Sequence, residues 1–161
     1  MISAIFLAAG QSKRIKGENK LVKNFKNKPL IYHSLKALQK SKINKIIVVL
    51  GFQSREVKKK INKKNKGFII MQSDMPFVRT TDINKIYNSI NKRKNLVHAL
   101  RFKNRIGNPI GFDASVRNKF KKFKGNVGAK YMVKRLRNNT NFIKVSSAKV
   151  FKDFDLKKDF N

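Results

Sequence analysis

The fold is decided by the stretch Ile2-Ser3-Ala4-Ile5-Phe6-Leu7-Ala8-Ala9-Gly10, an apolar run that ends in small residues and a glycine. The run up to Leu7 predicts a buried first β-strand. Gly10 and the small residues before it turn the backbone into a tight loop whose N–H groups can face an anion. Three cations lie within reach of this loop: Lys13, Arg14 and Lys20. Oriented amide donors and mobile cations together suit a triphosphate and its departing pyrophosphate.

The alternative interpretation of these cations is a solvated loop in a very basic protein. The chain carries 40 lysines and arginines against 8 acidic residues, a formal net charge of +32. Such a charge favours binding to nucleic acid or another polyanion. It is equally typical of a composition biased towards lysine, since the lysines are spread along the whole chain and no RNA-binding or zinc-finger signature accompanies them. We therefore expect no specific nucleic-acid partner.

The length of 161 residues predicts a single domain over residues 1–161. The chain contains no cysteine, which excludes disulfides and thiolate metal sites. Its first apolar run spans roughly eight residues, against the roughly 20 that a membrane helix needs. We expect a cytoplasmic monomer without a membrane partner.

Apolar runs alternate with helical patterns along the sequence. Strands are predicted at residues 2–7, 43–50, 68–71 and 96–100, with short strands at 142–145 and around Phe151. Helices are predicted from Pro29, over 53–64, from a cap at Thr80 or Thr81, and over 114–120 and 129–136. This order predicts a three-layer, Rossmann-like α/β fold with a mostly parallel sheet. Ligands bind such sheets beyond the carboxyl ends of the strands, where Gly10, Gly51 and Asp74 are placed. The two histidines, His33 and His98, fall on apolar faces and are interpreted as packed core residues.

Carboxylates are so few that their positions are informative. Asp74 directly follows the predicted strand 68–71, and Pro76 stiffens the turn after it. Nucleotidyl transfer requires a divalent ion, and Mg²⁺ commonly takes one or two protein carboxylates. Asp74 is therefore the candidate metal ligand, the alternative being a carboxylate that only caps a turn.

Five collinear motifs resemble those of the MobA-like nucleotidyltransferases, most closely the molybdopterin cytidylyltransferase branch. The first runs from Leu7 to Leu21, with Ile15 in place of methionine and Lys16 in place of glycine. The other four are Ser73-Asp74-Met75-Pro76, Gly107-Asn108-Pro109-Ile110-Gly111-Phe112, Gly125-Asn126-Val127-Gly128-Ala129-Lys130 and Asp153-Phe154-Asp155-Leu156-Lys157-Lys158-Asp159.

The resemblance implies a role for each matched position. Asp74 would hold Mg²⁺ and Asp155 would contribute to the same site, although Leu156 replaces the usual threonine; a solvated acidic cluster is the alternative for Asp155. The nucleotide would lie on Leu7, Ala8, Ala9, Gly10 and Lys20, with Lys13, Arg14 and Lys20 stabilising the reacting phosphates. The acceptor would be bound by the loop Gly107, Asn108 and Pro109 and, through a phosphate, by Gly125, Gly128 and Ala129 at a helix start.

The family also has a strand and a helix between the positions of Gly51 and Asp74, with a segment that contacts the nucleobase, and nothing here matches it. The chain is expected to lack one edge strand–helix unit, to expose its second strand as an edge, and to discriminate weakly between bases. The resemblance implies transfer of CMP from CTP to a phosphorylated acceptor of the molybdopterin type, with release of pyrophosphate. Two alternatives remain: a nucleotide-binding relic without turnover, and a basic nucleic-acid-binding protein.

Overall fold

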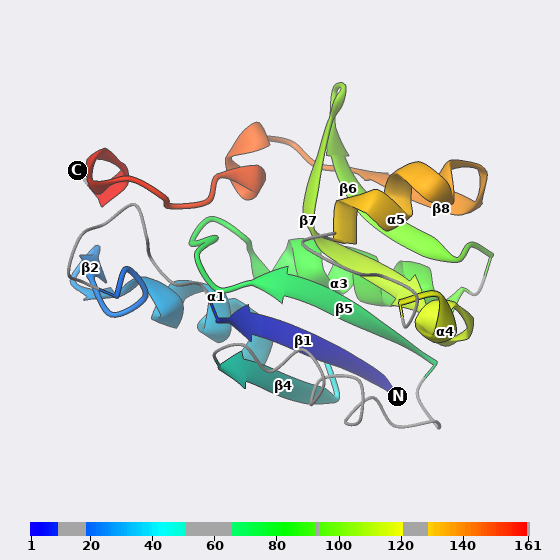
Figure 1. Ribbon diagram of the computed structural model, residues 1–161, viewed down its shortest axis with the longest axis horizontal. Helices are drawn as coiled ribbons and strands as arrows, with labels where there is room; N and C mark the ends of the chain where they lie inside the picture. The colour runs from blue at the N-terminus through cyan, green and yellow to red at the C-terminus, as the bar shows by residue number, and fades with distance from the viewer. Residues whose placement is uncertain (10–18, 51–65, 93, 121–128, 161) are drawn as a thin grey trace.

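The computed structural model describes residues 1–9, 19–50, 66–92, 94–120 and 129–160. Its centre is a six-stranded sheet in the order β4-β1-β5-β7-β6-β8 (Figure 1). The strands are β1 (Ile2–Ala8), β4 (Lys45–Leu50), β5 (Gly67–Gln72), β6 (Val97–Phe102), β7 (Arg105–Asp113) and β8 (Thr140–Lys144). All neighbours pair in parallel except β7, which is antiparallel to both β5 and β6. A two-stranded ribbon of β2 (Asn24–Phe25) and β3 (Lys28–Pro29) stands apart.

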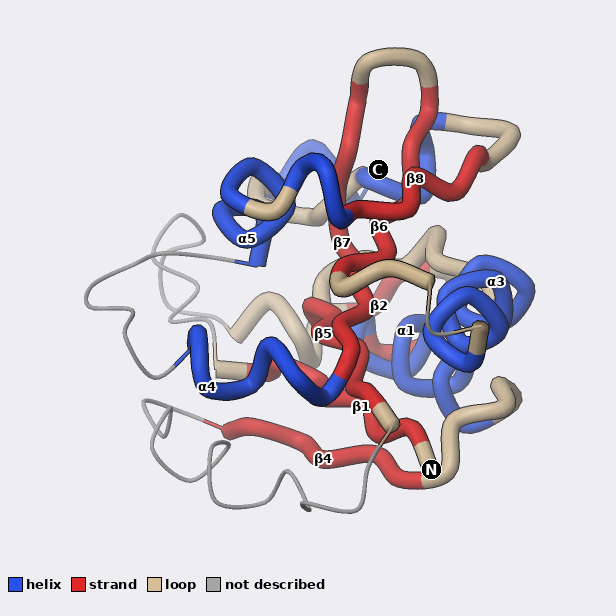
Figure 2. Tube along the Cα trace, turned by 90° about the vertical axis from the view of Figure 1, so that its right-hand side faces the viewer, coloured by secondary structure: helices blue, strands red, loops and turns tan. Residues whose placement is uncertain are grey.

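Helices cover both faces of the sheet, so the predicted three-layer, mostly parallel α/β fold is confirmed. The helices α1 (Leu30–Gln39) and α3 (Thr80–Asn91) lie on one face, and α4 (Arg117–Phe120) and α5 (Ala129–Arg135) on the other (Figure 2). Side chains alternate between the two layers along β1, since Phe6 packs with the first pair of helices and Ile5 with the second. None of the described helices is long and apolar enough to span a membrane.

The start of α3 differs from the predicted threonine cap. The N-cap is Arg79, whose N–H donates to the Asp82 carboxylate over 3.2 Å. Thr80 lies in the first turn, and its hydroxyl donates to the carbonyl of Ala37 in α1 over 3.2 Å. The threonine therefore ties the two helices together, while the acidic residue at the third position completes the cap.

Two other predictions are corrected by the structure. Gly107, Asn108 and Pro109 were expected to form a loop, but they lie within β7, the longest strand of the described chain. The segment around Phe151 was expected to be a strand, but residues Ala148–Phe151 form a 3₁₀ turn. The predicted helix over 53–64 lies outside the described residues, as does most of the segment where a strand–helix unit was expected to be missing.

β4 is an edge strand among the described strands, as predicted, although its apolar run had indicated full burial. Val49 is buried, whereas Val48 and Leu50 are 45% and 64% exposed. One of its edges pairs with β1 and the other has no described partner. The prediction of two histidines in packed environments is confirmed: His98 is 1% exposed, and half-buried His33 hydrogen-bonds through Nε2 to the Phe25 carbonyl over 2.8 Å.

Candidate active site

Three of the predicted site residues meet at one point beyond the carboxyl ends of β1 and β5. The Lys20 ammonium donates to Asp74 Oδ2 and to Asp155 Oδ1, both over 2.7 Å. The side chain of Lys20 is 9% exposed, that of Asp74 14% and that of Asp155 35%. The segments that carry them lie far apart in the sequence, so the tertiary fold alone brings them together.

Hydrogen bonds with three segments hold the backbone of Ser73 and Asp74. The N–H of Ser73 donates to the Leu7 carbonyl at the end of β1 over 3.1 Å. The hydroxyl of buried Ser34, in α1, donates to the Ser73 carbonyl over 2.6 Å. The N–H of Phe154 donates to the Asp74 carbonyl over 3.0 Å, which fixes the last segment of the chain against the end of β5.

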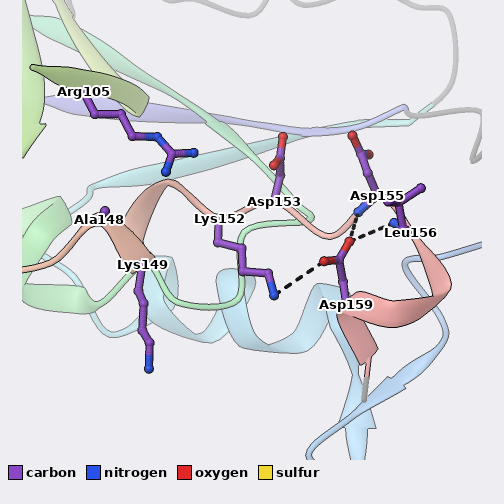
Figure 3. A pocket seen from close by; sticks show the side chains of 8 residues that line it. All are labelled: Arg105, Ala148, Lys149, Lys152, Asp153, Asp155, Leu156 and Asp159. Atoms are coloured by element: carbon purple, nitrogen blue, oxygen red, sulfur yellow. Dashed lines mark hydrogen bonds and ion pairs between the residues drawn. The ribbon is translucent and has the colours of Figure 1, made fainter.

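Asp155 is positioned by the residues on either side of it. Phe154 is 1% exposed and packs with Leu21 and Leu30 in a small apolar cluster under the site. The Asp159 carboxylate accepts from the N–H groups of Asp155 and Leu156, over 3.0 and 2.8 Å (Figure 3). The N–H of Leu156 is the largest of the influences that lower the pKa of Asp159. Asp159 thus supplies the turn-forming oxygen that is absent from Leu156, which stands where the family has a threonine.

The electrostatics of the cluster favour a cation between the carboxylates. Burial lowers the pKa of Lys20, but hydrogen bonds to Asp155 and Asp74 outweigh it and raise that pKa above its usual value. Lys20 is therefore charged at neutral pH. Asp74 Oδ1 is buried and accepts no hydrogen bond from any described donor. A buried carboxylate oxygen without a donor is unfavourable unless a cation approaches it.

The other predicted residues are distributed as follows. Leu7 and Ala8 end β1 and Ala9 follows it, which leaves their backbone at the edge of the sheet next to the cluster. Ala129 is the first residue of α5. Gly10, Lys13, Arg14, Gly125 and Gly128 lie outside the described residues.

The predicted acceptor loop is part of the sheet. Gly107, Asn108 and Pro109 lie in β7, and a Cβ atom at Gly107 would come within 2.7 Å of the Phe151 ring. The Asn108 side-chain amide donates to Gln72 Oε1 over 2.6 Å, and its own Oδ1 is buried without a described donor. Gly107 therefore serves close packing, and Asn108 is the member of the three that presents an unpaired polar atom.

An open pocket of about 470 Å³ adjoins Asp155. It is lined by Arg105, Ala148, Lys149, Lys152, Asp153, Asp155, Leu156 and Asp159 (Figure 3). Arg105 extends from β7 towards the carboxylates, whereas Lys149 points away and Lys152 pairs with Asp159 over 3.5 Å. Nothing in the sequence indicated a role for Arg105, because it precedes the matched motif and is one of many cations. In the described part of the chain no group of three acidic or histidine side chains forms a metal site.

Comparison with known proteins agrees with this fold. Residues 4–64 match the family model of the MobA-like NTP transferase domain. The predicted resemblance to the MobA-like nucleotidyltransferases is thereby confirmed over residues 4–64, whereas the molybdopterin cytidylyltransferase branch stays a prediction.

Individual relatives resemble the chain over different extents. A 51-residue segment is 49% identical to 2-C-methyl-D-erythritol 4-phosphate cytidylyltransferase from Lachnoclostridium phytofermentans. That segment is 31% of this chain and spans only 22% of the length of that enzyme. The crystal structure of Rv0371c from Mycobacterium tuberculosis H37Rv has a TM-score of 0.84 and 17% identity, over 99% of this chain and 95% of that one. The crystal structure of a manganese complex of Rv0371c has a TM-score of 0.81 and 17% identity, over 99% of this chain and 95% of that one. At these identities, the structural likeness establishes the fold alone.

Proposed function

We propose that the protein is a metal-dependent nucleotidyltransferase that transfers CMP from CTP to a phosphorylated acceptor and releases pyrophosphate. The observation that carries this proposal is the meeting of Lys20, Asp74 and Asp155 beyond the carboxyl ends of β1 and β5. The cytidylyltransferase relative supports a cytidylyl donor. A molybdopterin-type acceptor follows from the resemblance of the motifs, and the acceptor in the relative's name is likewise a phosphate ester.

The carboxylates fit a divalent ion. Asp74 and Asp155 already direct one oxygen each at a common cation, and Asp74 Oδ1 is buried without a described donor. Two carboxylates, with phosphate oxygens and water, make up the oxygen ligand set that Mg²⁺ prefers. A Mg²⁺ ion held by Asp74 and Asp155 would supply the positive charge that offsets the charge developing on the reacting phosphates.

The chain's own residues then bind and orient the reactants. The triphosphate lies over the end of β1, where Lys20, with Lys13 and Arg14, neutralises the departing pyrophosphate. The acceptor lies in the pocket beside Asp155, with Arg105 extending towards its anionic group. An acceptor phosphate oxygen attacks the α-phosphorus in line, and the bond from that phosphorus to the pyrophosphate oxygen breaks. Positioning and charge stabilisation account for such a reaction without a covalent intermediate on the protein.

The substitution Asp74→Asn tests this function. We expect it to abolish metal-dependent pyrophosphate release and metal-enhanced CTP binding, because the amide removes the carboxylate charge while keeping the shape. The control is Asp113→Asn, which removes an equal charge at a residue that caps the turn after β7. Circular dichroism should show both variants folded. Unchanged metal and nucleotide behaviour in Asp74→Asn would contradict the assignment.

A further inference from the structure

We propose that Lys20 is an internal competitor for the divalent ion: in the nucleotide-free protein its ammonium occupies the metal position between Asp74 and Asp155. Bare metal is thereby bound weakly, and the ion enters together with the triphosphate that draws Lys20 away. This inference rests on the proposed function, because it concerns the same two carboxylates.

The geometry makes the two occupants mutually exclusive. The ammonium nitrogen lies 2.7 Å from an oxygen of each carboxylate. Oxygen ligands of Mg²⁺ lie about 2.0–2.1 Å from the ion, so a divalent ion held by the same two oxygens would occupy the volume that the ammonium fills. A monovalent and a divalent cation at such a separation repel strongly in a site that is largely removed from water. One must leave before the other binds.

Exchange requires movement of one side chain only. The Lys20 backbone lies in a turn in which the Val22 N–H donates to the Asn19 carbonyl over 3.1 Å. The next residue, Leu21, is 5% exposed and its carbonyl accepts from the Ile31 N–H over 3.1 Å. These contacts anchor the turn to α1, whereas the lysine side chain has four rotatable carbon–carbon bonds. A triphosphate over the end of β1 would offer the ammonium new oxygens, so that the carboxylates are vacated at the moment the nucleotide brings its ion.

A structural ion pair would behave differently from a competitor. If Lys20 only stabilised the fold, its removal would leave metal affinity unchanged or would weaken it by loosening the site. If Lys20 competes, its removal must strengthen metal binding while it weakens nucleotide binding. The opposite signs of these two effects separate the two roles.

The experiment measures Mn²⁺ binding to the whole chain without nucleotide, by electron paramagnetic resonance of the free ion. We expect Lys20→Ala to bind Mn²⁺ at least about tenfold more tightly than the wild type. If the ammonium occupies the site about nine-tenths of the time, only about one-tenth of the protein can bind the ion, and the apparent affinity is about tenfold lower. Lys42→Ala removes the same charge from an exposed position and should leave the affinity unchanged. Adding Asp74→Asn to Lys20→Ala should remove the gain.

Lys20→Met, which keeps the apolar stem, repeats the measurement with a side chain of similar length. In both Lys20 variants Mn²⁺ should raise the unfolding temperature more than it does in the wild type. Equal or weaker Mn²⁺ binding in the folded Lys20 variants, or no Mn²⁺ binding in any variant, would overturn the inference. If the wild type and the Lys20 variants bind Mn²⁺ equally well and the wild type still releases pyrophosphate, the proposed function stands and the competitor role of Lys20 is wrong.

Discussion

Lys20 lies between Asp74 and Asp155, so that one ammonium group contacts two carboxylates. Asp74 and Asp155 could be singled out, because carboxylates are rare in this chain and both stand in matched motifs. Their contact with Lys20 could not be predicted, since Lys20 lies 54 residues from one partner and 135 from the other. The sequence indicated only a loop cation for the phosphates. The position of an ammonium between two carboxylates is a property of the tertiary structure.

His98 gives the stability of the fold a dependence on pH. It is 1% exposed, and its Nδ1 lies 2.7 Å from the hydroxyl of Ser89, which also accepts from the side-chain amide of Asn141 over 2.6 Å. Burial lowers the pKa of His98 from 6.5 to about 4, against the opposing influence of the Asn95 backbone and Asp113. The histidine is therefore neutral in the folded protein at pH values where it is charged in the unfolded chain.

We predict that the free energy of unfolding decreases as the pH falls from 6.5 towards 4. The stabilising contribution of His98 is complete above 6.5, and about 3 kcal/mol is lost by the time the folded pKa is reached. Urea unfolding at a series of pH values measures the decrease. His98→Gln should flatten it over this range, whereas Ser115→Ala, an exposed and non-titrating position, should leave the slope in place. A wild-type slope that His98→Gln does not alter would show that another group is responsible.

At the scale of elements, β7 is the part that the sequence concealed. Glycine and proline are typical of turns, and the matched motif pointed to a loop. The strand accepts them for specific reasons. In the pairing of β6 with β7, Ala99 lies opposite Ile110, but the next residue, Leu100, lies opposite Gly107. Asn108 and Pro109 therefore have no partner in β6 and form a bulge. A proline is tolerated in a bulge because its missing N–H is not needed there. Gly107 then leaves room for Phe151.

We predict that Gly107→Ala lowers the free energy of unfolding by about 1–3 kcal/mol, the usual range for overpacking. The added methyl group would lie 2.7 Å from Phe151 Cδ1, and Phe151 is only 6% exposed. Chemical denaturation measures the loss. In a Phe151→Ala background the same substitution should be much less destabilising, because the ring that it strikes is gone. Equal losses in the two backgrounds would place the strain elsewhere.

For the whole molecule, the alternation of apolar runs was enough to predict a three-layer fold with a mostly parallel sheet. The order of its strands was not predictable, because it depends on β7 entering antiparallel between β5 and β6. The net charge of +32 is likewise a property of the whole chain, and it makes weak attraction of any polyanion unavoidable. A specific site must be distinguished from that background.

The dependence of binding on salt concentration distinguishes a specific nucleotide site from general attraction of polyanions. We predict that calorimetric titration with CTP and Mg²⁺ at physiological salt still detects binding, because the contacts are short-range and assisted by the metal. Binding of a single-stranded RNA should weaken steeply as salt rises, by orders of magnitude when many phosphates are contacted. The same titration with GTP and ATP should give affinities within about tenfold of that for CTP, or roughly 1.4 kcal/mol. Tight, salt-resistant RNA binding without detectable CTP binding would favour the nucleic-acid-binding alternative.

The hydrogen bond from Phe154 to the end of β5 also has a consequence for the nascent chain on the ribosome. All six strands of the sheet have been synthesised once Lys144 has been added, before Asp155 exists. Until the segment that carries Asp155 docks, Lys20 can meet Asp74 alone. The second carboxylate arrives only with the segment that Phe154 docks, so a polypeptide whose sheet has formed before that docking still has an unfinished cation site.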